Sequence, residues 1–312
     1  MLSVIIPCYN EEKVARECHK RLTAALTNVG EYELLFVNDG SRDATLSILK
    51  ELRQSDERLK IISFSANRGH QVAVTAGLDY AQGDAIAIID ADLQDPPELI
   101  PAMLEKMREG FDVVYGKRKS REGDSAFKKA TAWGFYRMLS KLTSTEIPAD
   151  TGDFRLISKK AADAIRAMPE RNRFLRGMFA WIGFRQTAIE FERSKRFAGE
   201  TKYPLRSMIK LAGNGVYSFS LKPIGWIWKT GALLILAALV WLLALLILAA
   251  SRGAGYGISA AAALNALLHG LLLCAIGVAG VYVGRIYQEA QGRPLYFPDE
   301  LIGLERGIKK VE

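Results

Sequence analysis

The first 115 residues alternate short apolar runs with longer amphipathic segments, a pattern typical of alternating strands and helices. Strands are predicted at Leu2–Pro7, Glu33–Val37, Lys60–Phe64, Ala85–Ile89 and Asp112–Tyr115. Helices are predicted at Glu11–Val29, in a segment ending at Gln54, from His70 to Ala81, and after Pro96-Pro97. Elements in this order form βαβ units with right-handed crossovers, so we expect an α/β fold with a doubly wound, mainly parallel sheet.

The last third of the chain holds two long apolar stretches. Neither Thr230–Ala250 nor Gly253–Gly284 contains Asp, Glu, Lys or Arg. About 20 apolar residues of helix cross the ~30 Å hydrocarbon core of a bilayer, whereas soluble helices of that length usually carry a polar stripe. We therefore predict two transmembrane helices, at 230–250 and 258–284, rather than two buried core helices.

Basic residues lie on both sides of this helix pair. Lys222 and Lys229 precede it, Arg285 and Arg293 follow it, and the short connection holds Arg252. Because Lys and Arg favour the cytoplasmic side, we expect a multi-pass protein of the cell (inner or plasma) membrane with both termini in the cytoplasm. The three cysteines form no CxxC pair, which fits a reducing compartment.

The segment 193–229 is strongly basic, with eight Lys or Arg residues and one acidic residue, in a chain of net charge +8. Apolar and aromatic residues are interleaved with these charges, as in segments that lie at the interface of a bilayer with anionic headgroups. Nucleic-acid binding produces a similar composition. We favour the lipid bilayer and no nucleic acid, because the segment adjoins the two predicted transmembrane helices.

Polar clusters follow three of the predicted strands, at Pro7–Glu11, Asn38–Ser41 and Asp90–Asp95. Each alone can be a turn with a helix cap, because Asn and Ser are common N-cap residues. The carboxyl ends of parallel strands meet at one edge of a sheet, where ligands bind in folds of this type. Three clusters at that edge together predict a binding crevice that contains several carboxylates.

Two aspartates of the third cluster have the spacing of a metal site. In an extended turn Asp90 and Asp92 point to the same side, and Gln94 continues the series. Mg²⁺ prefers oxygen ligands and is often held by one or two carboxylates together with substrate phosphates. The sequence therefore predicts that Asp90, Asp92 and Gln94 hold Mg²⁺ or Mn²⁺.

Six motifs make the chain resemble a known family. They are Ser3–Glu11, Val37–Asp43, Asn67–Gly69, Asp90–Pro97, Thr151–Leu156 and Gly284–Tyr296. In this order they resemble glycosyltransferase family 2, and within it the branch of dolichyl-phosphate mannose synthase and bactoprenol glucosyltransferase. The likeness covers nearly the whole chain, although Lys117-Arg118 stands where relatives often have a small residue before the arginine.

The resemblance implies a GT-A (Rossmann-like) fold and a nucleotide-sugar site. The contacts that it implies are Pro7, Tyr9, Glu11, Asp39, Asn67, Asp90 and Asp92. Of these, Asp39 is implied to contact the nucleobase and Asp90 to lie near the ribose and the sugar, with Asp92 and Gln94 at the metal. Asp39 can also be a turn-stabilising aspartate.

A phosphate monoester on a lipid is the acceptor that the resemblance implies. Its second pKa lies near 6, so it is largely a dianion at neutral pH and is already a nucleophile. The enzyme chiefly has to orient it. Arg118 and Arg121 are candidates for holding this phosphate through the guanidinium fork, although either can be a solvated loop charge. Arg193, Arg196 and Lys202 are expected to guide the phosphate into the crevice.

Asp153 is implied to be a catalytic or acceptor-side carboxylate, and with Asp92 and Arg118 it completes the predicted catalytic set. A general base contributes ~10²–10⁴-fold where one is required. Because a dianionic acceptor has little need of one, we expect Asp153 to orient rather than to abstract a proton.

The function that follows is inverting transfer of a hexose from a nucleotide-sugar, with UDP-glucose as first choice, to polyprenyl (undecaprenyl) phosphate. GDP-mannose and UDP-N-acetylglucosamine stay open as donors. A processive polysaccharide synthase is expected to have a QxxRW motif, which the chain lacks, and a non-catalytic subunit has no need of Asp90 and Asp92.

The predicted organisation is a cytoplasmic catalytic domain at 1–192, the basic amphipathic segment 193–229, the two transmembrane helices and a cytoplasmic tail at 285–312. The amphipathic part of that tail, Leu295–Leu304, makes self-association plausible. The sequence leaves the oligomeric state open.

Overall fold

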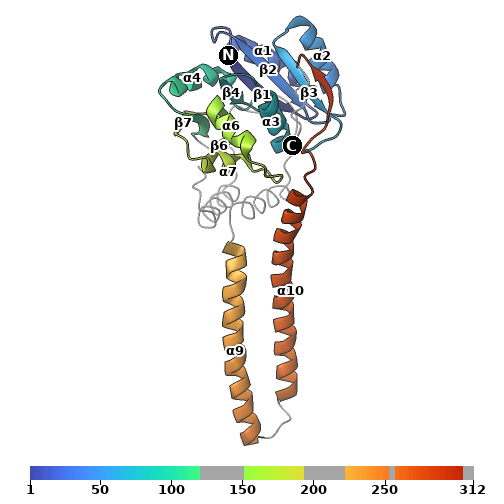
Figure 1. The fold of residues 1–312 in the computed structure, drawn as a ribbon, viewed down its shortest axis with the longest axis vertical. Helices are drawn as coiled ribbons and strands as arrows, with labels where there is room; N and C mark the ends of the chain where they lie inside the picture. Colours follow the sequence, from blue (N-terminus) through green and yellow to red (C-terminus); the bar gives the residue numbers. More distant parts are fainter. Residues whose placement is uncertain (120–150, 193–221, 253–256, 305–312) are drawn as a thin grey trace. The chain divides into compact units, whose positions relative to one another are not determined.

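The structure, a computed structural model, describes residues 1–119, 151–192, 222–252 and 257–304. The chain divides into two compact units. The first contains the strands and the shorter helices together with the residues from Arg293 onward, and the second contains two long helices. Figure 1 draws the elements of both.

The first unit is built on one eight-stranded mixed sheet. Its strands are β1 (Leu2–Cys8), β2 (Tyr32–Asn38), β3 (Leu59–Phe64), β4 (Ala85–Ile88), β5 (Val113–Arg118), β6 (Thr151–Ser158), β7 (Gln186–Phe191) and β8 (Pro298–Ile302). They lie in the order β7-β5-β6-β4-β1-β2-β3-β8. Strands β3, β2, β1 and β4 form a continuous parallel block, which confirms the predicted α/β fold.

Helices cover both faces of the sheet, as right-handed crossovers require. They are α1 (Ala15–Ala25), α2 (Thr45–Ser55) and α4 (Ile100–Arg108, after the 3-10 turn η1 at Pro97–Leu99) on one face, and α3 (His70–Tyr80) and α6 (Lys159–Ala167) on the other, with α7 (Leu175–Trp181) against α6. Val4 and Ile6 of β1 belong to the core with α1, α2 and α4. Ile5 points the other way and lies so close to α3 that a Cβ on Gly77 would clash with its Cγ2.

The sheet departs from the prediction beside β4. We expected Asp112–Tyr115 to close a parallel series, but β6 lies antiparallel between β4 and β5. Apolar periodicity marks a strand without naming its partner, so this insertion has no signature in the local pattern.

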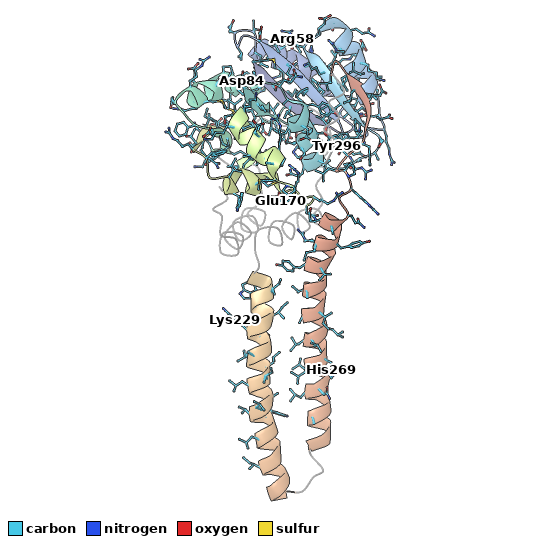
Figure 2. The ribbon with its side chains drawn as sticks, in the orientation of Figure 1. Arg58, Asp84, Glu170, Lys229, His269 and Tyr296 are labelled. Carbon is cyan, nitrogen blue, oxygen red and sulfur yellow. The ribbon has the colours of Figure 1, made fainter. Side chains whose placement is uncertain are left out.

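Residues that follow the long helices return to the sheet. Strand β8 pairs antiparallel with β3, and Lys50 Nζ donates to Glu300 Oε1 at 2.8 Å. Tyr296, labelled in Figure 2, stacks on Phe64 with ring centroids 4.9 Å apart, and its hydroxyl donates to Asp79 Oδ2 at 3.0 Å. Part of the predicted cytoplasmic tail is therefore an edge strand of the first unit.

The second unit consists of α9 (Lys222–Arg252) and α10 (Gly257–Ala290), which pack against each other. Their described apolar side chains are largely exposed, and Leu273 is among the most exposed of them. Within the described residues one segment, Leu267–Ala290, is long and apolar enough to cross a membrane, with a mean hydropathy of 2.0, and Lys229–Trp241 is a shorter apolar stretch. Helices occupy both predicted positions, and the transmembrane hairpin stays a prediction.

Candidate active site

The carboxyl ends of the parallel strands lie at one edge of the sheet, named here the carboxyl edge. Strands β1 and β2 stay in register up to Cys8 and Asn38, and β4 runs parallel to β1. The polar segments that follow β1 and β2 bond to each other. The Asn10 backbone N–H donates to Ser41 Oγ at 2.9 Å, and the Arg42 N–H donates to Asn10 Oδ1 at 2.8 Å. The first two predicted clusters therefore form one surface.

Asp39 is buried directly after β2 and binds the loop that precedes α3. Its Oδ1 accepts from the Arg68 N–H at 2.6 Å, and its Oδ2 accepts from the Gly69 N–H at 2.8 Å and the Asn67 amide at 2.9 Å. Burial raises the pKa of Asp39, and the two backbone N–H groups oppose that rise. A carboxylate has about four acceptor positions, so Asp39 stabilises this loop and still has room for about one donor from a ligand.

Gly40 lies where this loop contact excludes a side chain. Its φ is +64°, and a Cβ would lie 2.6 Å from both the Ala66 carbonyl carbon and the Asn67 nitrogen. Left-handed backbone costs an L-residue about 1–2 kcal/mol, and the clash adds to this in Gly40→Ala. Gly30→Ala is the matched control, because φ is +91° there and no atom lies within 4 Å. We expect denaturant unfolding to show the larger loss for Gly40→Ala; equal losses would contradict the close approach.

Strand β6 brings Asp153 to the carboxyl edge opposite Asp90. Strands β4 and β6 pair antiparallel up to Ile88 opposite Arg155, and Asp90 and Asp153 each lie two residues beyond this pair, at the same end of the two strands. His70, the first residue of α3, lies between the two carboxylates. Its Nδ1 is 3.7 Å from Asp90 Oδ1, and its Nε2 is 3.1 Å from Asp153 Oδ2.

Arg176 of α7 holds Asp153 from another side. Its Nε donates to Asp153 Oδ1 at 2.8 Å and its Nη2 donates to Oδ2 at 3.1 Å, a two-point contact of the kind guanidinium makes with carboxylates. The neighbouring Leu175 N–H donates to Gln71 Oε1 at 2.9 Å, which ties the start of α7 to the start of α3. Asp90, His70, Asp153 and Arg176 therefore form a row of alternating charge.

The pKa values of this row follow from burial and from neighbouring charges. Burial lowers the pKa of His70, but the carboxylates of Asp90 and Asp153 outweigh it and raise that pKa to about 9. Burial acts to raise the pKa of Asp153, yet Arg176 and His70 hold it well below its usual range. At neutral pH the structure therefore contains an imidazolium at His70 and a carboxylate at Asp153.

Asp90 and Asp92 offer the oxygen ligands that Mg²⁺ or Mn²⁺ prefers. Burial raises the pKa of Asp90, His70 opposes this rise, and the carboxylates of Asp153 and Asp92 add to it. A bound cation would relieve this repulsion. Asp92 Oδ1 accepts from the Gln94 N–H at 3.1 Å. Among the residues that the structure describes, no group of three or more His, Cys, Asp or Glu is placed to hold a metal, so a cation here would need substrate or water oxygens as well.

Arg118 ends β5 at the same edge. Its Nη2 lies 3.8 Å from the buried Asp95 Oδ1, and its side chain is one quarter exposed. A Cβ on Gly152 would lie 3.0 Å from this Nη2, so the glycine leaves the space that the guanidinium fills. Gly152 directly precedes Asp153, which brings Arg118 next to the charged row.

The remaining predicted site residues divide into two sets. Pro7 is buried in β1, and Tyr9 and Glu11 follow it half-buried, with the Glu11 N–H donating to Thr45 Oγ1 at 2.8 Å. The other set, Arg121, Arg193, Arg196 and Lys202, lies outside the described residues.

Two contacts of the site were not predicted from the sequence, namely those of Gln71 and Arg176. Asp153 lies in β6 and Arg176 in α7, with α6 between them, and no sequence motif links the two residues. Of the residues around Asp153, the sequence marked His70 as the predicted first residue of a helix.

Comparison with known proteins gives the family. The family model described as glycosyl transferase family 2 matches residues 3–166. The chain is 48% identical over 305 residues to the uncharacterized glycosyltransferase YkcC of Bacillus subtilis, which covers 97% of this chain and 94% of that one. It is 38% identical over 301 residues to the prophage bactoprenol glucosyl transferase homolog of Escherichia coli, with 95% and 97% of the two chains covered.

Among solved structures, that of glucosyl-3-phosphoglycerate synthase from Mycobacterium tuberculosis with Mn²⁺, UDP-glucose and phosphoglyceric acid is 16% identical, with a TM-score of 0.47 over 70% of this chain and 77% of that one. The sheet, its two helical layers and the family match define a GT-A glycosyltransferase. The chain belongs to glycosyltransferase family 2, as the motifs at its strand ends predicted.

Proposed function

We propose that the protein transfers a hexose from a nucleotide-sugar to polyprenyl phosphate at the cytoplasmic leaflet, with UDP-glucose and undecaprenyl phosphate as the first donor and acceptor to test. The observation that carries this proposal is the likeness to the bactoprenol glucosyl transferase homolog, which covers 95% of the chain. A likeness limited to the family domain at 3–166 would support sugar transfer alone. A likeness that continues through both long helices supports a lipid acceptor as well.

The apolar helices fit an acceptor that resides in a membrane. We place α9 and α10 across the bilayer as a hairpin, because their described apolar side chains are exposed. Basic residues also stand at the start of α9 and near the end of α10, as expected where both of these ends face the cytoplasm. The basic residues that precede α9 in the sequence are then expected to meet anionic headgroups on the cytoplasmic side.

The carboxyl edge supplies the donor site in this proposal. Asp39 and the loop at 67–69 hold the nucleobase, and Asp90 lies near the ribose and the sugar. Asp90, Asp92 and Gln94 are the residues that would hold Mg²⁺ or Mn²⁺, and a cation bound there would neutralise charge on the diphosphate leaving group.

The acceptor side is governed by positive charge and orientation. Arg118 receives the lipid phosphate at the end of β5, and the basic residues at 121, 193, 196 and 202 deliver it. A dianionic phosphate needs no base, so Asp153 serves to orient. Attack from the face opposite the leaving diphosphate inverts the anomeric carbon.

The test gives the purified full-length protein, in lipid nanodiscs, undecaprenyl phosphate with Mg²⁺ or Mn²⁺ and one nucleotide-sugar at a time. UDP-glucose, UDP-N-acetylglucosamine and GDP-mannose form the panel, and mass spectrometry identifies the lipid product. We expect one hexose per lipid phosphate from one preferred donor. Transfer to water alone would contradict the lipid acceptor, and a polymer on the lipid would favour a processive synthase.

A further inference from the structure

Arg176 lies in α7, which packs against α6, yet its side chain reaches Asp153 in the row of alternating charge at the carboxyl edge. We propose that Arg176 is a positioning residue, which fixes the Asp153 carboxylate in the orientation that sugar transfer requires. The proposal rests on the proposed function, because it gives Arg176 a task in that reaction. It also assigns Asp153 the part of a fixed anion rather than that of a proton acceptor.

The contacts of Asp153 leave little freedom to its side chain. Arg176 Nε and Nη2 engage the two carboxylate oxygens separately, at 2.8 and 3.1 Å, and His70 Nε2 lies 3.1 Å from Oδ2. The two Arg176 bonds use two of about four acceptor positions of the carboxylate, and His70 adds an ion pair. Rotation of the carboxylate would break both Arg176 bonds at once, so its plane is set by α7. The strongly depressed pKa of Asp153 agrees with this arrangement.

Helix α7 also holds the backbone of Asp153. Arg155 Nε donates to the Asp153 carbonyl at 3.2 Å, and Arg155 Nη2 donates to the Gly152 carbonyl at 3.0 Å. The Arg155 guanidinium in turn lies over the Phe179 ring of α7, 4.4 Å from its centroid. Helix α7 therefore contacts Asp153 directly through Arg176 and indirectly through Phe179, which packs on Arg155.

The start of α7 is itself tied to the element that carries His70. The Leu175 N–H bonds to Gln71, the residue that follows His70, so the two cations on Asp153 come from helix ends that are joined to each other. An arrangement with this many shared supports is expected to hold the Asp153 carboxylate in one position. A displacement of ~1 Å in such a group can cost about 10²-fold in rate.

Substitution of Arg176 tests the proposal. Arg176→Gln is expected to lower kcat by about 10²-fold while the donor KM changes by less than about threefold, because orientation rather than binding is lost. Arg176→Lys keeps the charge but not the planar fork, so it should recover only part of the activity. Full recovery by Lys would show that charge alone is needed and would overturn the positioning role.

A double-mutant cycle with Asp153→Asn separates positioning from general stability. If Arg176 acts through Asp153, the double variant is no slower than Asp153→Asn alone, whereas additive losses would overturn the proposal. Arg173→Gln, in the segment just before α7, is the matched control, because Arg173 donates to the Ile165 and Met168 carbonyls and not to the row of alternating charge. We expect Arg173→Gln to lose stability and to keep kcat; a 10²-fold loss there would mark the Arg176 effect as structural.

Two measurements distinguish a failure of the positioning role from a failure of the proposed function. Turnover is followed as lipid-linked product and as slow hydrolysis of the donor, which needs no lipid. A wild-type protein that hydrolyses the donor but never glycosylates polyprenyl phosphate contradicts the proposed function, and the cycle is then measured on hydrolysis. If the wild-type protein makes the lipid product but the losses of Arg176→Gln and Asp153→Asn add up in the double variant, only the positioning role is contradicted.

Discussion

Asp92→Asn is expected to lower kcat by about 10³-fold, the largest effect of any single substitution considered for this protein. Asn has nearly the shape of Asp and can still accept the Gln94 N–H bond at 3.1 Å, so the local turn should survive. What disappears is one negative charge beside Asp90, at the position where a divalent cation and the diphosphate would meet. The change therefore removes charge stabilisation while it preserves the fold.

Two measurements make this expectation specific. Titration of the variant with Mn²⁺ should show weaker metal binding, as well as slower turnover with saturating donor. Asp84→Asn is the control, because Asp84 lies just before β4, at the opposite end of that strand, and pairs with the N-terminal amine at 3.2 Å. More than a tenth of wild-type turnover in Asp92→Asn, or a comparable loss in Asp84→Asn, would count against a metal at this edge.

The part of the carboxyl edge formed by β1, β2 and β4 could be predicted because parallel strands impose their own geometry. The buried runs of β1, β2 and β4 are apolar, and each ends in a polar cluster, so the clusters had to meet once the strands were parallel. Asp39, Asp90 and Asp92 were found in this way. Their contacts could not be predicted, since the bonds of Asp39 to the loop at 67–69 depend on a left-handed Gly40.

The part of the edge around Asp153 depends on pairings between distant segments. Asp153 faces Asp90 only because β6 inserts antiparallel beside β4, and a run of alternating residues does not specify its partner strand. Arg176 joins the row through a helix that follows β6 and α6. For the same reason β8 was interpreted as a tail, because its partner β3 lies more than 200 residues earlier in the chain.

Asp153→Asn is expected to lower kcat by about 10²-fold, with a donor KM within about threefold of the wild type, because an oriented anion is lost and donor contacts are kept. The pH dependence of this deficit reveals the role of Asp153. A carboxylate whose pKa is held well below 3.8 stays ionised throughout pH 6–8, so its own titration does not enter that window.

The acceptor phosphate does titrate in that window, since its second pKa lies near 6. A general base would matter most at pH 6, where much of the acceptor still carries a proton, and the deficit of Asp153→Asn would shrink toward pH 8. A fixed anion would produce the same deficit at every pH, and this is the result we expect from turnover measured at half-unit steps. Asp163→Asn, an exposed change on α6, should match the wild type throughout. A deficit that vanishes by pH 8 would make Asp153 a base, because only a proton-transfer role becomes dispensable once the nucleophile has ionised by itself.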